Sequence, residues 1–310
     1  MGTPAFAVPA LGAVAATCEV ALVVTQPDRP RGRGREVAES EVSEAARALR
    51  LEVWKPADMR SADVSQRLRV VAPDLFAVVA FGAILSPDLL QVPRLGAVNL
   101  HGSLLPDFRG AAPVQRALWE GRGETGVSTL FMDEGIDTGD VILTRAEGIA
   151  PEDDAGTLAT RLAAIGAPLL AESLGLAFTG RAPRTPQDRA AGSYAKKLRK
   201  SDGVVDWALD AVTVWNHQRA VTPWPGATTT IRGTPLTLVR TRPLYRAAPA
   251  ADPGRVVAIR DGVTVSCGSG TLSLERVKPS GRAEMDAADW ARGARIEVGD
   301  RLGEWGEVPA

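Results

Sequence analysis

Two polar residues at the end of an apolar run, Asn99 and His101, are the strongest candidates for chemistry in this sequence. Residues 95–101 read LGAVNLH, which is typical of a β-strand. Side chains two residues apart on a strand project from the same face, so the amide and the imidazole point together. Such a pair can stabilise an oxyanion and transfer a proton. The spacing alone allows equally that both side chains only satisfy backbone groups at the strand end.

A third candidate is Asp137, in the segment MDEGIDTGD at residues 132–140. A carboxylate near an imidazole holds its tautomer and favours the charged ring. The same segment could instead be an exposed acidic turn between strands, which is the commoner use of such sequences. It could also be a metal site, although its spacing matches no EF-hand. We expect no disulfide framework or zinc site, because Cys18 and Cys267 are far apart and outside any CxxC pattern.

The first half of the chain alternates apolar runs with helical patterns, which predicts an α/β domain with a doubly wound, mostly parallel sheet. Open sheets of this kind bind ligands at the carboxyl ends of their strands, where Asn99 and His101 lie. The predicted strands are residues 21–25, 75–80, 95–101, 127–132 and 141–147. The predicted helices are residues 40–51 and 61–71, followed by one long helix over 151–176.

After a helix predicted at residues 207–221, the pattern changes to short alternating runs separated by Gly, Pro and Asp. This spacing predicts a second, smaller β-barrel or β-sandwich. The resulting division places an α/β domain at residues 1–180, a basic linker at 181–199 and a β-rich domain at 200–310. The apolar runs of the second domain are residues 228–231, 236–241, 254–259, 263–267 and 272–277.

Composition indicates a soluble protein. Hydrophobic residues make up 45% and charged residues 24% of the chain. No stretch approaches the roughly 20 uninterrupted apolar residues that a membrane span needs. The first residues, MGTPAFAVPALGAVAA, lack the basic region of a signal peptide, so we expect a cytoplasmic protein.

Charge is distributed unevenly along the chain. Residues 1–180 carry 16 Lys and Arg against 23 Asp and Glu, whereas residues 181–199 carry six basic residues and one acid. Those six include Lys196 and Lys197. A second basic cluster, within the acidic first domain, contains Arg29, Arg31, Arg33 and Arg35. Two such patches on a nearly neutral protein suit a polyanionic partner, or they are simply solvated loops.

Several separated motifs give the chain a resemblance to a known family. VNLHGSLLPDFRGAAPVQRALWEG, at residues 98–121, and TGVSTLFMDEGIDTGDVIL, at residues 125–143, resemble the signature region of the folate-dependent formyltransferases. Other segments narrow the resemblance to the methionyl-tRNA branch of that family. These segments are GTPAFAVPAL, TQPDRPRGRGRE, AVTPWPGATT and RVKPSGRAEM, and together the motifs cover nearly the whole chain.

The resemblance implies a role for each candidate. Asn99, His101 and Asp137 correspond to a catalytic trio, and Arg33 to the key arginine of a loop that grips the tRNA acceptor end. The second domain corresponds to a β-barrel (OB-like) that helps the basic linker to bind tRNA. The loop that holds the reduced folate corresponds to Ser103, Leu104, Leu105 and Pro106. The residues assigned to tRNA are Arg31, Arg33, Arg35, Lys196 and Lys197.

The implied activity is transfer of a formyl group from 10-formyltetrahydrofolate to methionine on the initiator tRNA, by a monomer that binds neither metal nor membrane. Alternatives within the superfamily are a formyltransferase for a nucleotide sugar or glycinamide ribonucleotide, and a deformylase. A non-catalytic tRNA-binding protein is a further alternative. A Rossmann dehydrogenase is disfavoured, because no GxGxxG follows a strand.

The start of the chain departs from the family pattern. The family begins with an apolar strand of about six residues before the GTP turn, whereas this sequence begins Met1-Gly2-Thr3. That first strand is central in a doubly wound sheet. We therefore expect the strands at residues 21–25 and 75–80 to flank a vacant position, and we expect the natural protein to have residues upstream.

Overall fold

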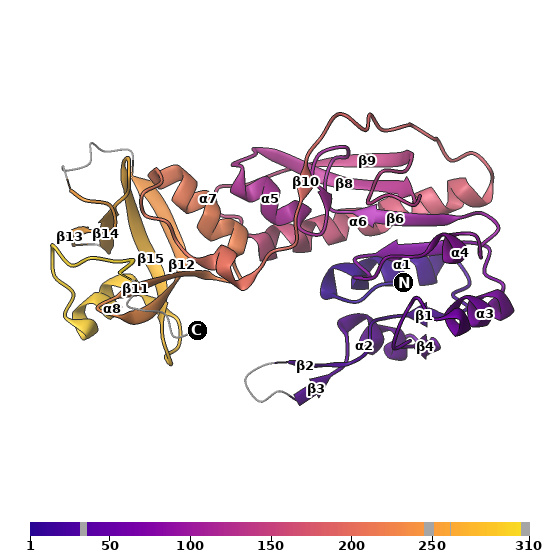
Figure 1. Ribbon diagram of the computed structural model, residues 1–310, viewed down its shortest axis with the longest axis horizontal. Coiled ribbons are helices and arrows are strands. Elements are labelled where there is room, and N and C mark those ends of the chain that lie inside the picture. The colour runs from indigo at the N-terminus through magenta and orange to yellow at the C-terminus, as the bar shows by residue number, and fades with distance from the viewer. Residues whose placement is uncertain (32–35, 245–250, 261, 305–310) are drawn as a thin grey trace. The chain divides into compact units, whose positions relative to one another are not determined.

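The chain forms two compact units in the computed structural model, which describes residues 1–31, 36–244, 251–260 and 262–304. Unit 1 consists of Met1–Pro113, Glu124–Gly148 and Ala159–Lys196. Unit 2 consists of Val114–Gly123, Ile149–Leu158 and Lys197–Ala310. Two helices labelled in Figure 1, α5 (Pro113–Trp119) and α6 (Ala155–Phe178), contribute residues to both units.

Unit 1 is built on a mixed sheet. Strands β5, β6, β8 and β9 are hydrogen-bonded in that order, with β5 and β6 parallel and the other two pairs antiparallel. The short connection of residues 132–140 explains the antiparallel pairing of β8 with β9, since a parallel pair needs a crossover of a dozen or more residues. Strands β1 and β4 form a separate parallel pair. The bounds are β1 (Val23–Val24), β4 (Val53–Trp54), β5 (Phe76–Val79), β6 (Ala97–His101), β8 (Glu124–Phe131) and β9 (Val141–Gly148).

The first two residues lie between β1 and β5. Gly2 N donates to Val24 O on one side, and Val79 N donates to Met1 O on the other. Beyond Met1, the space between β1 and β5 is a cavity of about 340 Å³, which is lined by β1, β5, α1 and the end of α6. The position that the strands at residues 21–25 and 75–80 are expected to flank is therefore filled at one end by Met1 and Gly2 and vacant over the rest.

Serine side chains cap the starts of two helices of unit 1, α2 and α4. The side chain of Ser40 accepts a hydrogen bond from Ser43 N at the start of α2, and α3 ends at Ala72, whose φ is 50°. Helix α6 packs against β8. Thr129 Oγ1 of β8 lies 2.7 Å from Ser173 Oγ of α6. The helices are η1 (Ala5–Ala7), α1 (Val8–Thr17), α2 (Glu41–Ala48), α3 (Ala62–Val71) and α4 (Pro87–Leu90).

Within the described residues, α6 is long and apolar enough to cross a membrane by length and composition alone. Half of its most apolar stretch is buried inside the protein, and a buried core helix passes the same test, so this is weak evidence for a span.

Two short strand pairs complete unit 1. Strands β2 (Arg29–Arg31) and β3 (Glu36–Ala38) form an antiparallel pair. Strand β10 (Tyr194–Ala195), at the end of the basic segment, pairs in parallel with β7 (Arg109–Gly110). Residues up to Lys196 of the basic segment thus belong to unit 1.

Unit 2 contains an antiparallel sheet in the order β11-β12-β15-β14-β13, with β16 paired to β15. Leu302 bridges Ile231 of β11, and Arg301 bridges Arg255 beside β13, so one short segment contacts both ends of this sheet. The strands are β11 (Ala227–Ile231), β12 (Thr234–Leu244), β13 (Val256–Ile259), β14 (Val263–Ser266), β15 (Thr271–Pro279) and β16 (Met285–Asp286).

Helix α7 (Ala211–Val221) begins later than the expected residue 207, because the side chain of Asp210 caps it by accepting from Val212 N and Thr213 N. Trp207 lies in the core of unit 2, where its Nε1 donates to Thr229 Oγ1 at 3.0 Å. The other helices of this unit are η2 (Lys200–Gly203) and α8 (Ala287–Ala294).

Candidate active site

Asn99 and His101 lie at the carboxyl end of β6, as the strand pattern predicts. Asn99 is opposite Leu130 of β8, and His101 is opposite Ser128. The side chain of His101 is 5% exposed, so the imidazole lies almost wholly inside the protein. An imidazole at this depth needs polar partners, and the neighbouring loops supply them.

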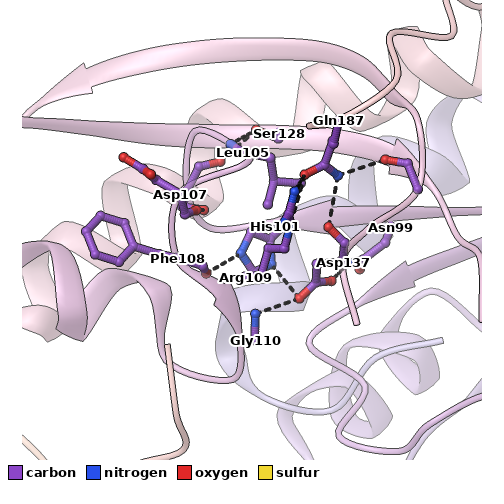
Figure 2. A network of polar contacts seen from close by, with 12 residues as sticks. Asn99, His101, Leu105, Asp107, Phe108, Arg109, Gly110, Ser128, Asp137 and Gln187 are labelled. Atoms are coloured by element: carbon purple, nitrogen blue, oxygen red, sulfur yellow. Dashed lines mark hydrogen bonds and ion pairs between the residues drawn. The ribbon is translucent and has the colours of Figure 1, made fainter. Parts of the chain in front are cut away.

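Asp137, in the turn between β8 and β9, meets both side chains. Its Oδ1 accepts a hydrogen bond from Asn99 Nδ2 at 3.1 Å, and its Oδ2 lies 3.4 Å from His101 Nδ1. Oδ2 also accepts from Gly110 N at 2.9 Å. The three candidates from the sequence therefore lie in direct contact, and Figure 2 shows them converging on the carboxylate.

The second ring nitrogen of His101 is held from the opposite side. His101 Nε2 lies 2.9 Å from Phe108 O, which can only accept, so Nε2 carries a proton and donates. Phe108 N in turn donates to Ser193 Oγ at 3.0 Å. An oxygen acceptor thus faces each ring nitrogen, and the plane of the imidazole is fixed by groups on both edges.

The loop after β6 is held by its own polar contacts. Ser103 Oγ donates to Asp107 O at 2.6 Å, and Ser103 O accepts from Ser128 Oγ at 2.7 Å. Leu105 N donates to the same Ser128 hydroxyl at 3.0 Å. The hydroxyl of Ser103 is fully buried and used within the loop, whereas Leu104, Leu105 and Pro106 are half-buried. The apolar part of the loop is therefore the part with surface to offer a ligand.

The arginine cluster falls largely outside the described residues. Arg33 and Arg35 lie there, and Arg31 is the last residue of β2, opposite Glu36. Lys196 and Lys197 are exposed and directly follow β10. A shared role of these residues with the trio stays a prediction.

Two residues near the site are not among the candidates that the sequence indicates. Gln187 donates from Nε2 to Asp137 O at 2.9 Å and to Gly139 O at 2.8 Å. Arg109 donates from Nε and Nη2 to Gln187 Oε1, at 3.1 and 3.0 Å. The QD pair at residues 187–188 reads as part of a polar linker, and no local pattern links it to a turn some 50 residues earlier.

Other groups that could do chemistry are clusters of metal ligands and the thiol of Cys267. Among the residues that the structure describes, no group of three or more His, Cys, Asp and Glu side chains could hold a metal ion. Burial, with a smaller contribution from the charge of Asp210, raises the pKa of the Cys267 thiol to about 12. That thiol is therefore a poor nucleophile near neutral pH.

Comparison with known proteins identifies the family. Residues 8–174 match the family model for the formyl transferase domain, and residues 197–295 match the model for the formyl transferase C-terminal domain. The chain is 42% identical to a methionyl-tRNA formyltransferase of Geobacter sulfurreducens, over 99% of this chain and 97% of the relative. It is 47% identical to one of Streptomyces coelicolor, over 98% of each chain.

Solved structures share the fold at lower identity. An N-formyltransferase from Helicobacter canadensis, in complex with folinic acid and dTDP-3-aminofucose, is 15% identical with a TM-score of 0.65. The similarity covers 88% of this chain and 96% of that one. HypX from Aquifex aeolicus, in complex with tetrahydrofolic acid, is 21% identical with a TM-score of 0.57, over 87% of this chain and 47% of that one.

The Asp137 carboxylate, which contacts both Asn99 and His101, lies in a chain that matches two formyl transferase models. The N-terminal part matches the first model, and the C-terminal part matches the model of the C-terminal domain. The identity of the chain to the curated relatives extends over nearly their full length. The chain belongs to the formyl transferase family, in its methionyl-tRNA formyltransferase branch.

Proposed function

We propose that this chain transfers the formyl group of 10-formyltetrahydrofolate to the free amino group of methionyl-initiator tRNA, and so supports translation initiation. The observation that carries this proposal is the 42–47% identity to methionyl-tRNA formyltransferases over nearly the whole of both chains. The aligned region covers unit 2 as well as the active-site residues.

The reaction needs charge stabilisation and proton transfer but no covalent enzyme intermediate. The methionine amine attacks the formyl carbon, and the carbonyl electrons move to oxygen in a tetrahedral intermediate. When the intermediate collapses, the bond from carbon to folate N10 breaks, the amine loses a proton, and N10 gains one. A site for this reaction must offer donors to the oxyanion and a route for the proton.

Asn99, His101 and Asp137 fit these needs. An amide nitrogen carries two donors, and Asp137 Oδ1 takes one of those of Asn99. We assign the other to the developing oxyanion, which the positive charge of protonated His101 also stabilises. Asp137, whose carboxylate faces both residues, stabilises the imidazolium and accepts the amine proton directly or through water.

The substrates are assigned to neighbouring segments. We assign the reduced folate to the loop of Ser103, Leu104, Leu105 and Pro106, whose half-buried apolar residues follow directly from His101. The tRNA is assigned to the two basic segments, where Lys and Arg neutralise phosphates. Those basic residues are Arg31, Arg33, Arg35, Lys196 and Lys197.

The finer architecture is part of the same proposal. Residues 1–180 form the catalytic domain, 181–199 the basic linker and 200–310 the tRNA-binding domain. That last domain is an OB-like β-barrel, which is supported by the contacts of Arg301 and Leu302 with Arg255 and Ile231 at the two ends of the sheet. We propose that the protein acts as a cytoplasmic monomer and needs no membrane.

Acceptor selectivity tests this function. The purified chain is incubated with 10-formyltetrahydrofolate and, in separate reactions, charged initiator tRNA, glycinamide ribonucleotide and a dTDP-amino sugar. Mass spectrometry follows formylation of each acceptor. We expect rapid formylation of the charged tRNA alone. Preferential formylation of a small amine would favour a different member of the superfamily, and tRNA binding without formyl transfer would mark a non-catalytic tRNA-binding protein.

A further inference from the structure

We propose that Gln187 is a positioning residue that holds Asp137 in place for formyl transfer, a role that rests on the proposed function. Gln187 touches neither Asn99 nor His101 in the described contacts. It acts on the backbone of the turn that carries the carboxylate. Figure 2 shows its amide between Arg109 and that turn.

The backbone of Asp137 needs such support. Its φ is 54°, in the left-handed region that residues other than glycine adopt infrequently. A residue in this region keeps its conformation only when the surroundings fix it. The side-chain amide of Gln187 donates to Asp137 O at 2.9 Å and to Gly139 O at 2.8 Å, so it ties together two carbonyls of the same turn.

Arg109 fixes which way this amide points. The guanidinium has donors only, and two of them reach Gln187 Oε1 at 3.1 and 3.0 Å. Arg109 is 9% exposed, and its other contacts are to the carbonyls of Asp188 and Ala191. With Oε1 held by the guanidinium, the two donors on Nε2 must face the turn, where two carbonyls accept them.

The segment that carries Gln187 is itself anchored on both sides of the site. Thr185 exchanges two backbone hydrogen bonds with Val141, at 2.9 and 3.0 Å, just after the Asp137 turn. Beyond Gln187, β10 pairs with β7. Gly192 has a φ of 86°, and a Cβ there would lie 2.1 Å from Pro106 O, so only glycine allows this close approach to the loop after His101.

Asp137 is therefore held in place by two groups. Gly110 N, on β7, donates to Asp137 Oδ2, while Gln187 holds the backbone of the same residue. If the turn relaxes, Oδ1 and Oδ2 move away from Asn99 and His101. A misplacement of 1 Å can cost roughly 100-fold in rate, so loss of Gln187 should be visible in kcat.

Two substitutions separate the contacts of Gln187. Gln187→Glu retains an oxygen for Arg109 but loses both donors to the turn, and Gln187→Met removes all polar contacts without adding charge. Gln66→Glu, at an exposed position of α3, is the matched control for the added charge. Formylation of methionyl-tRNA is measured with kcat expressed per mole of folded enzyme and KM determined for both substrates.

We expect both Gln187 variants to lose roughly 10- to 100-fold in kcat, with KM for folate and tRNA within about twofold of the wild type. Gln66→Glu should behave as the wild type. A merely structural role would reduce the folded fraction and leave kcat per mole of folded enzyme in place.

Wild-type kcat in both Gln187 variants would overturn the positioning role. If neither variant folds, Arg109→Lys carries the test, because a lysine keeps the charge but cannot hold Oε1 with two donors. Reduced kcat with KM unchanged supports the proposal, and unchanged kcat overturns it. A wild-type enzyme that does not formylate methionyl-tRNA would be a failure of the proposed function, which this assay separates from a failure at Gln187.

Discussion

The carboxylate of Asp137 links Asn99 to His101. Its Oδ1 accepts from Asn99 Nδ2 at 3.1 Å, and its Oδ2 lies 3.4 Å from His101 Nδ1, although Asp137 is 38 residues beyond Asn99 in the chain. One side chain therefore sets the position of both the amide donor and the imidazole. The roles proposed for the site depend on this relationship.

Replacing Asn99 with Ala should lower kcat by roughly 100- to 1,000-fold, because that is the usual cost of removing one donor to an oxyanion. KM for methionyl-tRNA should change much less, since the donor acts on charge that develops in the transition state. Steady-state formylation kinetics give both values. A loss of less than about tenfold in kcat would contradict the oxyanion role.

Stability should fall as the pH is lowered through about 6.5, in part because of His217. Burial lowers the pKa of His217 from its usual 6.5, and its Nε2 lies 2.7 Å from Asp202 O. Below pH 6.5 the unfolded chain therefore binds a proton that the folded chain resists. The stability that the neutral ring contributes is complete above that pH and is lost as the pH falls toward the folded pKa.

Urea unfolding of the wild type and of His217→Gln, at about pH 8 and about pH 5.5, measures this contribution. Glutamine can still donate to Asp202 O but does not titrate. We expect the variant to lose less free energy of unfolding than the wild type between the two pH values. Equal losses would show that His217 does not contribute.

An apolar strand added before Met1 should stabilise the chain. The cavity of about 340 Å³ lies between β1 and β5, and burial lowers the pKa of the Met1 amine to about 5. A strand of about six residues would fill that space, pair with backbone groups on both sides and remove the buried amine. We expect a higher melting temperature for the extended chain than for the chain that begins at Met1.

A control extension of six Gly and Ser residues separates filling of the cavity from loss of the amine, since it removes the amine but supplies no apolar side chains. Equal melting temperatures for the apolar extension and the unextended chain would mean that the sheet does not use this position.

Arg33→Ala should weaken catalysis through the tRNA. We expect a lower kcat/KM for methionyl-tRNA and an unchanged KM for the folate. The slope of log(kcat/KM) for methionyl-tRNA against log salt concentration should be shallower by about one, which corresponds to one counterion. Arg69→Ala, at an exposed position of α3, is the matched control. If the variant shows wild-type tRNA kinetics over a range of salt, the assignment of Arg33 to the tRNA fails.

Local rules predicted much of the fold. Helix α3 follows from the apolar spacing of residues 61–71, and the common face of Asn99 and His101 follows from their places on β6. The sequence predicts that α7 starts at residue 207, whereas the helix begins at Ala211, because Trp207 packs in the core of unit 2. Tertiary packing decided that boundary.

Local sequence rules do not predict the contacts that hold Asp137 in place. Gln187 and Arg109 are 78 residues apart, and their contact depends on a segment that returns from the end of α6 to pair with β7. A polar residue in a Pro- and Arg-rich stretch has no periodicity that reveals its partner. Only the folded chain brings it to the turn.

The most direct test of the site is single-turnover formylation of methionyl-initiator tRNA, with enzyme in excess, by the wild type and by Asp137→Asn. The variant keeps the shape of the side chain and an oxygen for Asn99, but it loses the charge that faces His101. We predict rapid formylation by the wild type and a rate at least about 100-fold lower in the variant, as is usual for loss of a proton-transfer group. Equal rates for the two enzymes, or no formylation by either, would contradict the assignment of Asp137, Asn99 and His101 as the centre of formyl transfer.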